Sequence, residues 1–89
     1  MRKVEWVVVK SYYEKHRLIR RELYGYSDKV KDCLQIIRNY KNIVLNDQEP
    51  FLKDAESVTG HYVRSGLDVR SNEGRLIEFR VHSIHIFVP

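Results

Sequence analysis

One segment of this sequence combines tyrosine and arginine at a spacing suited to binding phosphates and bases. Within residues 11–24 the pattern fits a helix that carries these side chains on one face. Arginine forms paired hydrogen bonds with phosphate, and a tyrosine ring stacks on a base. We therefore predict a nucleic-acid-binding surface made of Tyr13, Arg17, Arg20, Arg21 and Tyr24, which Arg64 and Arg70 extend. The alternative interpretation is a solvated helix surface whose tyrosines are half-buried.

A second set of side chains, Glu78, Arg80 and His82, alternates with apolar residues near the C-terminus. On a strand all three project from the polar face. A carboxylate can take the 2′-hydroxyl proton of RNA, an arginine can hold the phosphate, and a histidine can protonate the leaving oxygen. The alternative, a ladder of charges on a solvated sheet, is the commoner use of such a pattern and is favoured here.

This Glu-Arg-His set resembles that of barnase-type ribonucleases. The small basic chain, with its expected order of strand, helix, helix and strand, also resembles RelE-type toxins. The resemblance covers only this gross order, and it implies metal-independent RNA cleavage. The sequence departs from that family at Val81-His82-Ser83-Ile84, where the family has a clear turn.

Charge is distributed unevenly along the chain. The net charge is +4, but residues 1–31 contain nine Lys and Arg against four Asp and Glu, which makes this segment +5. The remaining residues contain seven Lys and Arg against eight Asp and Glu, so their net charge is −1. This asymmetry predicts an anionic partner, either nucleic acid or an acidic protein surface, on the N-terminal third.

Composition argues against several other classes of protein. The single cysteine, Cys33, excludes an internal disulfide and a cysteine-cluster zinc site, and His82 and His85 would face opposite sides of a strand. Neither a glycine-rich phosphate loop nor a known catalytic motif occurs, so we predict no metal and no cofactor. With no secretory signal and no apolar run long enough to span a bilayer, we expect a cytoplasmic protein without membrane contact.

The elements that would position these residues follow from local patterns. Residues 4–9 predict a strand buried on both faces. A capping box at Ser11 and Glu14 predicts a helix that ends at Gly25. Ser27 then caps a second helix, unless the two form one long kinked helix. The apolar face of this second helix consists of Val30, Cys33, Leu34, Ile37 and Tyr40.

The remaining segments predict mostly strands. Residues 43–45 fit a strand or a loop, residues 46–47 a turn, and residues 51–58 a short helix. Strands are expected over residues 62–70 and 75–88, joined by a turn at residues 71–74. The apolar phase of the last strand shifts at His82 and Ser83, which predicts a bulge there.

Together these elements predict a single α+β domain over residues 1–89, with two layers. Two helices pack on a small, mainly antiparallel sheet in the order β-α-α-(β/α)-β-β, and the first strand is a central or parallel member. We expect a non-enzymatic protein that binds DNA or RNA through the helix at residues 11–24. The first alternative is a regulatory protein-interaction module that forms a homodimer through the C-terminal strand. The second is the metal-independent ribonuclease.

Overall fold

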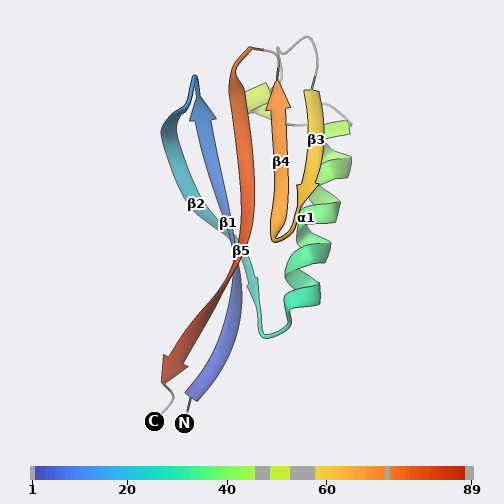
Figure 1. The fold of residues 1–89 in the computed structure, drawn as a ribbon. Helices are drawn as coiled ribbons and strands as arrows, with labels where there is room; N and C mark the ends of the chain where they lie inside the picture. Colours follow the sequence, from blue (N-terminus) through green and yellow to red (C-terminus); the bar gives the residue numbers. More distant parts are fainter. Residues whose placement is uncertain (1, 46–48, 53–57, 72, 88–89) are drawn as a thin grey trace.

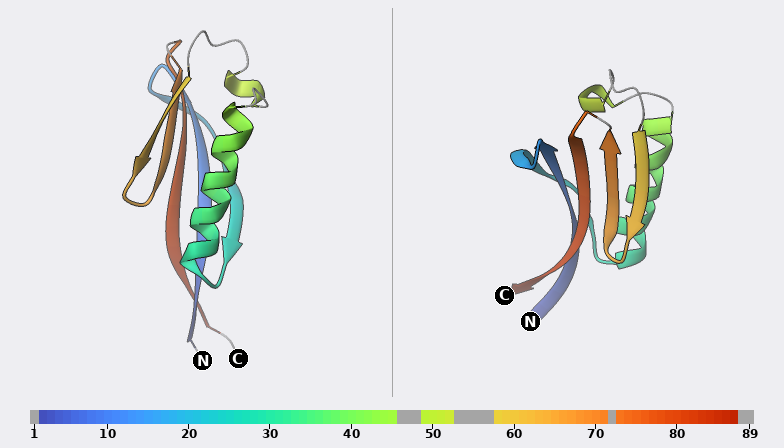
Figure 2. Two further views of the ribbon diagram at one scale, coloured as in Figure 1. Left: turned by 90° about the vertical axis from the view of Figure 1, so that its right-hand side faces the viewer. Right: turned by 45° about the horizontal axis from the view of Figure 1, so that its top comes forward.

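The computed structural model describes residues 2–45, 49–52, 58–71 and 73–87. Five antiparallel strands form one sheet in the order β2-β1-β5-β4-β3, and one α-helix packs on one face of it (Figures 1 and 2). The elements are β1 (Arg2–Glu14), β2 (Arg17–Ser27), α1 (Val30–Leu45), the 3₁₀ turn η1 (Pro50–Leu52), β3 (Val58–Val63), β4 (Gly66–Ser71) and β5 (Arg75–Phe87). The α+β class is confirmed, whereas the prediction of two helices is wrong.

Residues 11–24 form most of a β-hairpin, which corrects the predicted helix. β1 continues to Glu14, and β2 returns antiparallel to it, with Gly25 inside the strand. Aromatic and β-branched residues favour strands, and the pairing of β1 with β5 along its whole length outweighs the helical spacing. The strand-helix-helix-strand order behind the resemblance to RelE-type toxins is therefore absent from the described residues.

The helix predicted after Ser27 is present as α1. Ser27 Oγ accepts a hydrogen bond from the Lys29 backbone N–H at 3.1 Å, as expected for a residue that caps a helix. The buried face of α1 consists of Cys33, Ile37 and Tyr40. Val30, in contrast, is 41% exposed, so this member of the predicted apolar face lies outside the core.

A buried ion pair links the sheet to the segment after α1. Lys10 Nζ lies 3.2 Å from Glu49 Oε2, and Tyr40 donates a hydrogen bond to the same oxygen at 2.9 Å. The rings of Tyr12, Tyr24 and Tyr40 surround the ammonium group, with centroids 4.7–5.0 Å away. Burial lowers the pKa of Lys10, but Tyr12 and Glu49 outweigh that effect and the net pKa is raised. Burial, followed by the charge of Glu49, raises the pKa of Tyr40.

The single strand predicted over residues 62–70 is instead two strands, β3 and β4, joined at Arg64 and Ser65. Gly66 fits there because a Cβ atom would lie 1.7 Å from the carbonyl oxygen of Phe79. Residue 72 of the turn predicted at residues 71–74 lies outside the described residues, and across it the Gly74 N–H donates to the Ser71 carbonyl at 3.4 Å.

The segment between α1 and β3 differs from the prediction where it is described. Residues 43–45 belong to the last turn of α1, so they form neither a strand nor a loop. Of the predicted short helix, Pro50–Leu52 forms a 3₁₀ turn, and residue 58 already begins β3. The turn predicted at residues 46–47 lies outside the described residues.

β5 has no bulge at His82 and Ser83, which corrects the last prediction about this strand. Its pairing with β1 runs without a register shift from Arg2 opposite Phe87 to Glu14 opposite Arg75. The shift in apolar phase therefore means that the apolar side chains of β5 move from one face of the sheet to the other along the strand. Ile77 and Phe79 point toward α1, whereas the even-numbered Ile84 and Ile86 belong to the opposite face.

Candidate binding surface on the open face of the sheet

The sheet has one face covered by α1 and one face on which none of the described helices packs, and we call the latter the open face (Figure 2). Side chains alternate between the two. Tyr12 is buried against the core on the covered face, so its neighbour Tyr13 belongs to the open face. The face combines a polar centre, a hollow at one end and exposed apolar side chains at the other.

The polar centre is held by hydrogen bonds between strands. Arg21 Nε donates to Ser11 Oγ at 2.9 Å, and Arg21 also reaches the hydroxyl of Tyr13 at 3.4 Å. Glu78 lies opposite Ser11 in the register of β1 and β5. Arg80 lies 2.8 Å from Asp68 and 3.3 Å from Glu78, so two carboxylates hold its guanidinium.

The β1–β2 hairpin ends in a two-residue turn with an uncommon backbone. Lys15 and His16 have φ angles of 50° and 68°, as in the type I′ turns that match the twist of a hairpin. Glycine and asparagine are the usual residues at such positions, so this turn is strained. The Lys15 N–H donates to the carbonyl oxygen of Gly74 at 2.9 Å, which fixes this tip against the β4–β5 turn.

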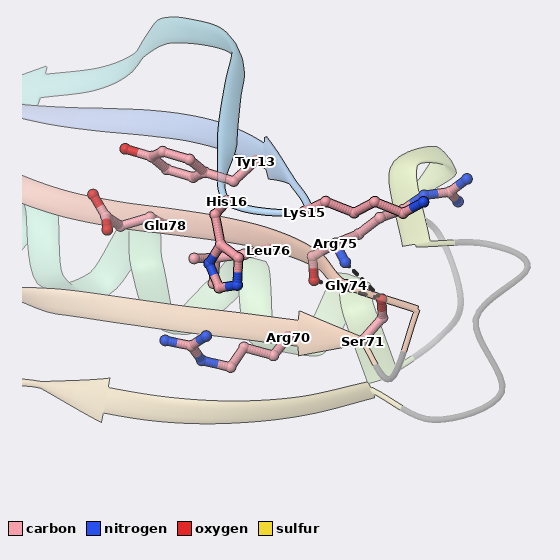
Figure 3. A pocket seen from close by; sticks show the side chains of 9 residues that line it. All are labelled: Tyr13, Lys15, His16, Arg70, Ser71, Gly74, Arg75, Leu76 and Glu78. Atoms are coloured by element: carbon pink, nitrogen blue, oxygen red, sulfur yellow. Dashed lines mark hydrogen bonds between the residues drawn. The ribbon is translucent and has the colours of Figure 1, made fainter.

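Between this tip and β4 lies a hollow of about 440 Å³, which we call the tip hollow (Figure 3). Its lining includes Tyr13, Lys15, His16, Arg70 and Glu78. Figure 3 shows the His16 ring in front of Leu76, between the strands that carry Tyr13 and Arg70. The Lys15 and Arg75 side chains extend away from the hollow in Figure 3, so the guanidinium of Arg70, which lies 3.9 Å from Asp68, is the charged group that an anion would meet there.

A second hollow, of about 480 Å³, lies further along the open face. Its lining includes Arg21, Glu78, Arg80 and His82, so the alternation predicted for the last three is confirmed. Glu78 therefore lines both hollows. On the side of the second hollow, the Arg80 guanidinium is already occupied by carboxylates.

The residues predicted to bind nucleic acid do not form one stripe. Tyr13, Arg21 and Arg70 share the open face. Arg20 lies over the ring of Tyr12, 4.2 Å from its centroid, and Tyr24 packs edge-on against Tyr40 and Phe79 in the core. Arg17 lies opposite Glu14 in the strand register at the end of the hairpin, and Arg64 is exposed at the β3–β4 turn.

Sequence reasoning missed Lys15 and His16. Inside a helix they would be ordinary polar residues, whereas in the hairpin they occupy the turn at the hollow. The signal that could have located a turn there is the pair of strand-favouring runs on either side of Glu14-Lys15-His16-Arg17. It is weak because the turn contains neither glycine nor asparagine.

The other end of the open face is apolar and accessible. Leu23 is 63% exposed and Tyr26 72%, while Ile84 and Ile86 are each about 40% exposed. β5 lies between β1 and β4, but β4 pairs with it only through residues 76–80. Beyond the bond from the Val81 N–H to the Ser65 carbonyl, no described strand pairs with this side of β5.

Comparisons with protein-family models, curated proteins and solved structures found no match. Within the described ranges, no three His, Cys, Asp or Glu side chains converge as metal ligands would. None of the described helices is long and apolar enough to cross a bilayer.

Proposed function

We propose that this protein binds single-stranded nucleic acid on the open face, with one phosphate in the tip hollow. The observation that carries the proposal is that His16 and Arg70 line one hollow next to the Tyr13 ring, while Lys15, also in its lining, extends its ammonium group away from them (Figure 3). A guanidinium pairs with a phosphate, and an aromatic ring near it stacks on a base. The excess positive charge of residues 1–31, which include the β1–β2 hairpin, supports the same partner.

A single strand fits this surface better than a duplex does. Bases of a single strand are free to stack on aromatic side chains, whereas in a duplex they are already stacked on one another. Arg21 contributes a second cation on the same face, and within the described residues it forms no ion pair. Arg21 on β2, Tyr13 on β1 and Arg70 on β4 spread two guanidinium groups and a ring across the open face, which suits a short stretch of extended backbone.

Fluorescence anisotropy with labelled single-stranded and duplex oligonucleotides tests the proposal. We expect tighter binding of single strands, weakened by salt because binding releases counterions. Replacing both Lys15 and Arg70 with Gln should remove most of the affinity. Arg64→Gln with Lys41→Gln is a control that removes the same charge elsewhere, and it should leave binding nearly unchanged. Absence of binding by folded protein at low salt would refute the proposal, as would equal losses in both double variants.

A second candidate function is protein interaction through the apolar end of the open face. Its support is the exposure of Leu23, Tyr26, Ile84 and Ile86, since exposed apolar clusters of this kind often mark interfaces. In this case a second copy of the chain would cover the C-terminal half of β5. Ile84→Lys should then shift sedimentation toward the monomer, whereas Val30→Lys, at a similarly exposed site on α1, should not. A wild-type protein that stays monomeric at high concentration would exclude this homodimer.

A further inference from the structure

We propose that the tip hollow also cleaves single-stranded RNA without a metal ion, with Glu78 as general base and His16 as general acid. This inference rests on the proposed nucleic-acid binding and adds a reaction to it. A carboxylate, an imidazole and the guanidinium of Arg70 line the same hollow. These are the groups that transfer of a phosphoryl group to a neighbouring hydroxyl requires.

The reaction is an internal displacement at phosphorus. The Glu78 carboxylate takes the proton of the 2′-hydroxyl, and the 2′ oxygen forms a bond to the adjacent phosphorus. The bond between phosphorus and the 5′ oxygen breaks, and protonated His16 gives its proton to that oxygen. The products are a 2′,3′-cyclic phosphate and a 5′-hydroxyl end. One proton is taken up and one released, so the step needs no other reactant, and Arg70 stabilises the charge that develops on the phosphate.

We assign His16 as the general acid in place of His82 because the two side chains line different hollows. His16 lines the same hollow as Glu78 and Arg70, and its ring lies between the strands that carry Tyr13 and Arg70 (Figure 3). His82 lines the second hollow, where Asp68 and Glu78 already hold the Arg80 guanidinium. Arg80 keeps the Glu78 carboxylate in place from that side, which makes it a positioning residue.

The backbone at the hairpin tip supports a functional role for His16. Two successive residues other than glycine adopt positive φ, and the strained turn is anchored to the Gly74 carbonyl. Strain of this kind is concentrated at functional sites, where the position of a side chain outweighs the cost in stability. The anchored turn holds the imidazole over the hollow before a substrate arrives, as acid catalysis requires.

The experiment uses a labelled single-stranded RNA in buffer with chelator, and separates products by their end groups. We expect a 2′,3′-cyclic phosphate end, and no cleavage where the 2′-hydroxyl is replaced by hydrogen. His16→Asn keeps a residue that tolerates positive φ, so the hairpin should fold. It should slow cleavage about 10²–10⁴-fold, the usual contribution of a general acid, as should Glu78→Gln for the base. His82→Asn is the matched control and should leave the rate within a few fold.

A second substrate, with sulfur in place of the 5′ oxygen at the scissile phosphate, isolates the role of His16. Sulfur leaves as a thiolate without protonation, so His16→Asn should cut this substrate nearly as fast as the wild type does. Glu78→Gln should remain slow on it. Equal cleavage by wild type and His16→Asn on ordinary RNA would overturn the assignment, and so would a loss caused by His82→Asn alone.

Binding of the 2′-deoxy oligonucleotide separates this inference from the function on which it rests. If the wild type binds that oligonucleotide but leaves RNA intact in chelator, the cleavage proposal fails and the binding proposal stands. If it neither binds nor cuts, both fail.

Discussion

The backbone N–H of Lys15 lies 2.9 Å from the carbonyl oxygen of Gly74 and joins two turns that are almost 60 residues apart in sequence. Both residues have positive φ, 50° at Lys15 and 81° at Gly74. The bond closes one end of the sheet and sets the position of His16 at the tip hollow.

Replacing His16 with glycine should stabilise the fold, because glycine adopts positive φ without strain. Glycine also loses more chain entropy on folding, so we expect a net gain of only about 0.5–1 kcal/mol. Chemical denaturation measures the change. Glu14→Gly, one position outside the two strained residues, is the control and should destabilise. A loss of stability in His16→Gly would show that the imidazole contributes to folding.

The buried pair of Lys10 and Glu49 should be far more sensitive to losing one partner than to losing both charges. Lys10→Met leaves a buried carboxylate unpaired, and we expect a loss of about 3–5 kcal/mol. Adding Glu49→Gln to that variant removes the charge, while the amide oxygen can still accept from Tyr40. The double variant should recover much of the loss, and denaturation curves that show no recovery would contradict the pairing.

The pH dependence of Lys10 follows from its raised pKa. Because the folded-state pKa lies above the ordinary value of 10.5, the contribution of Lys10 to stability is fully present below that value. It is lost only as the pH rises through the folded-state pKa. Thermal unfolding of the wild type should therefore show a loss of stability above about pH 10.5. The loss of stability should be smaller in the double variant Lys10→Met, Glu49→Gln. A matching loss in both would assign the effect to other groups.

The buried face of α1 gives a contrast between two neighbouring side chains. Ile37 is buried, whereas Leu34 is half-buried. Ile37→Ala should cost about 2–5 kcal/mol, the usual range for a buried aliphatic residue, and Leu34→Ala clearly less. Denaturation midpoints measure both, and the reverse order would refute the assigned face of the helix.

The sequence predicted correctly those features that are determined within a single helix or strand. The period of α1 and the alternation of Glu78, Arg80 and His82 follow from neighbours along one element, and both are present. The apolar spacing of residues 11–24 fits a helix as well as two strands. Pairing of Ser11–Glu14 with β5 decides between them, and the partners lie more than 60 positions away in sequence.

Two further features of the site depend on tertiary structure. Tyr24 falls where the register of β2 shifts against β1, which sends its ring into the core instead of the predicted stripe. Ile84 and Ile86 belong to the open face because β5 stays regular at the point where a bulge was expected. Neither outcome can be read from the spacing of residues within a single strand.

The most direct test of binding at the tip hollow is to follow the backbone amide signals of the labelled protein by NMR while a single-stranded oligonucleotide is added. We expect the largest shifts at Lys15, His16, Gly74 and Glu78, with smaller ones at Ser11 and Arg21. Shifts concentrated on the exposed face of α1, or on Leu23, Tyr26 and Ile84 with the tip unaffected, would contradict it.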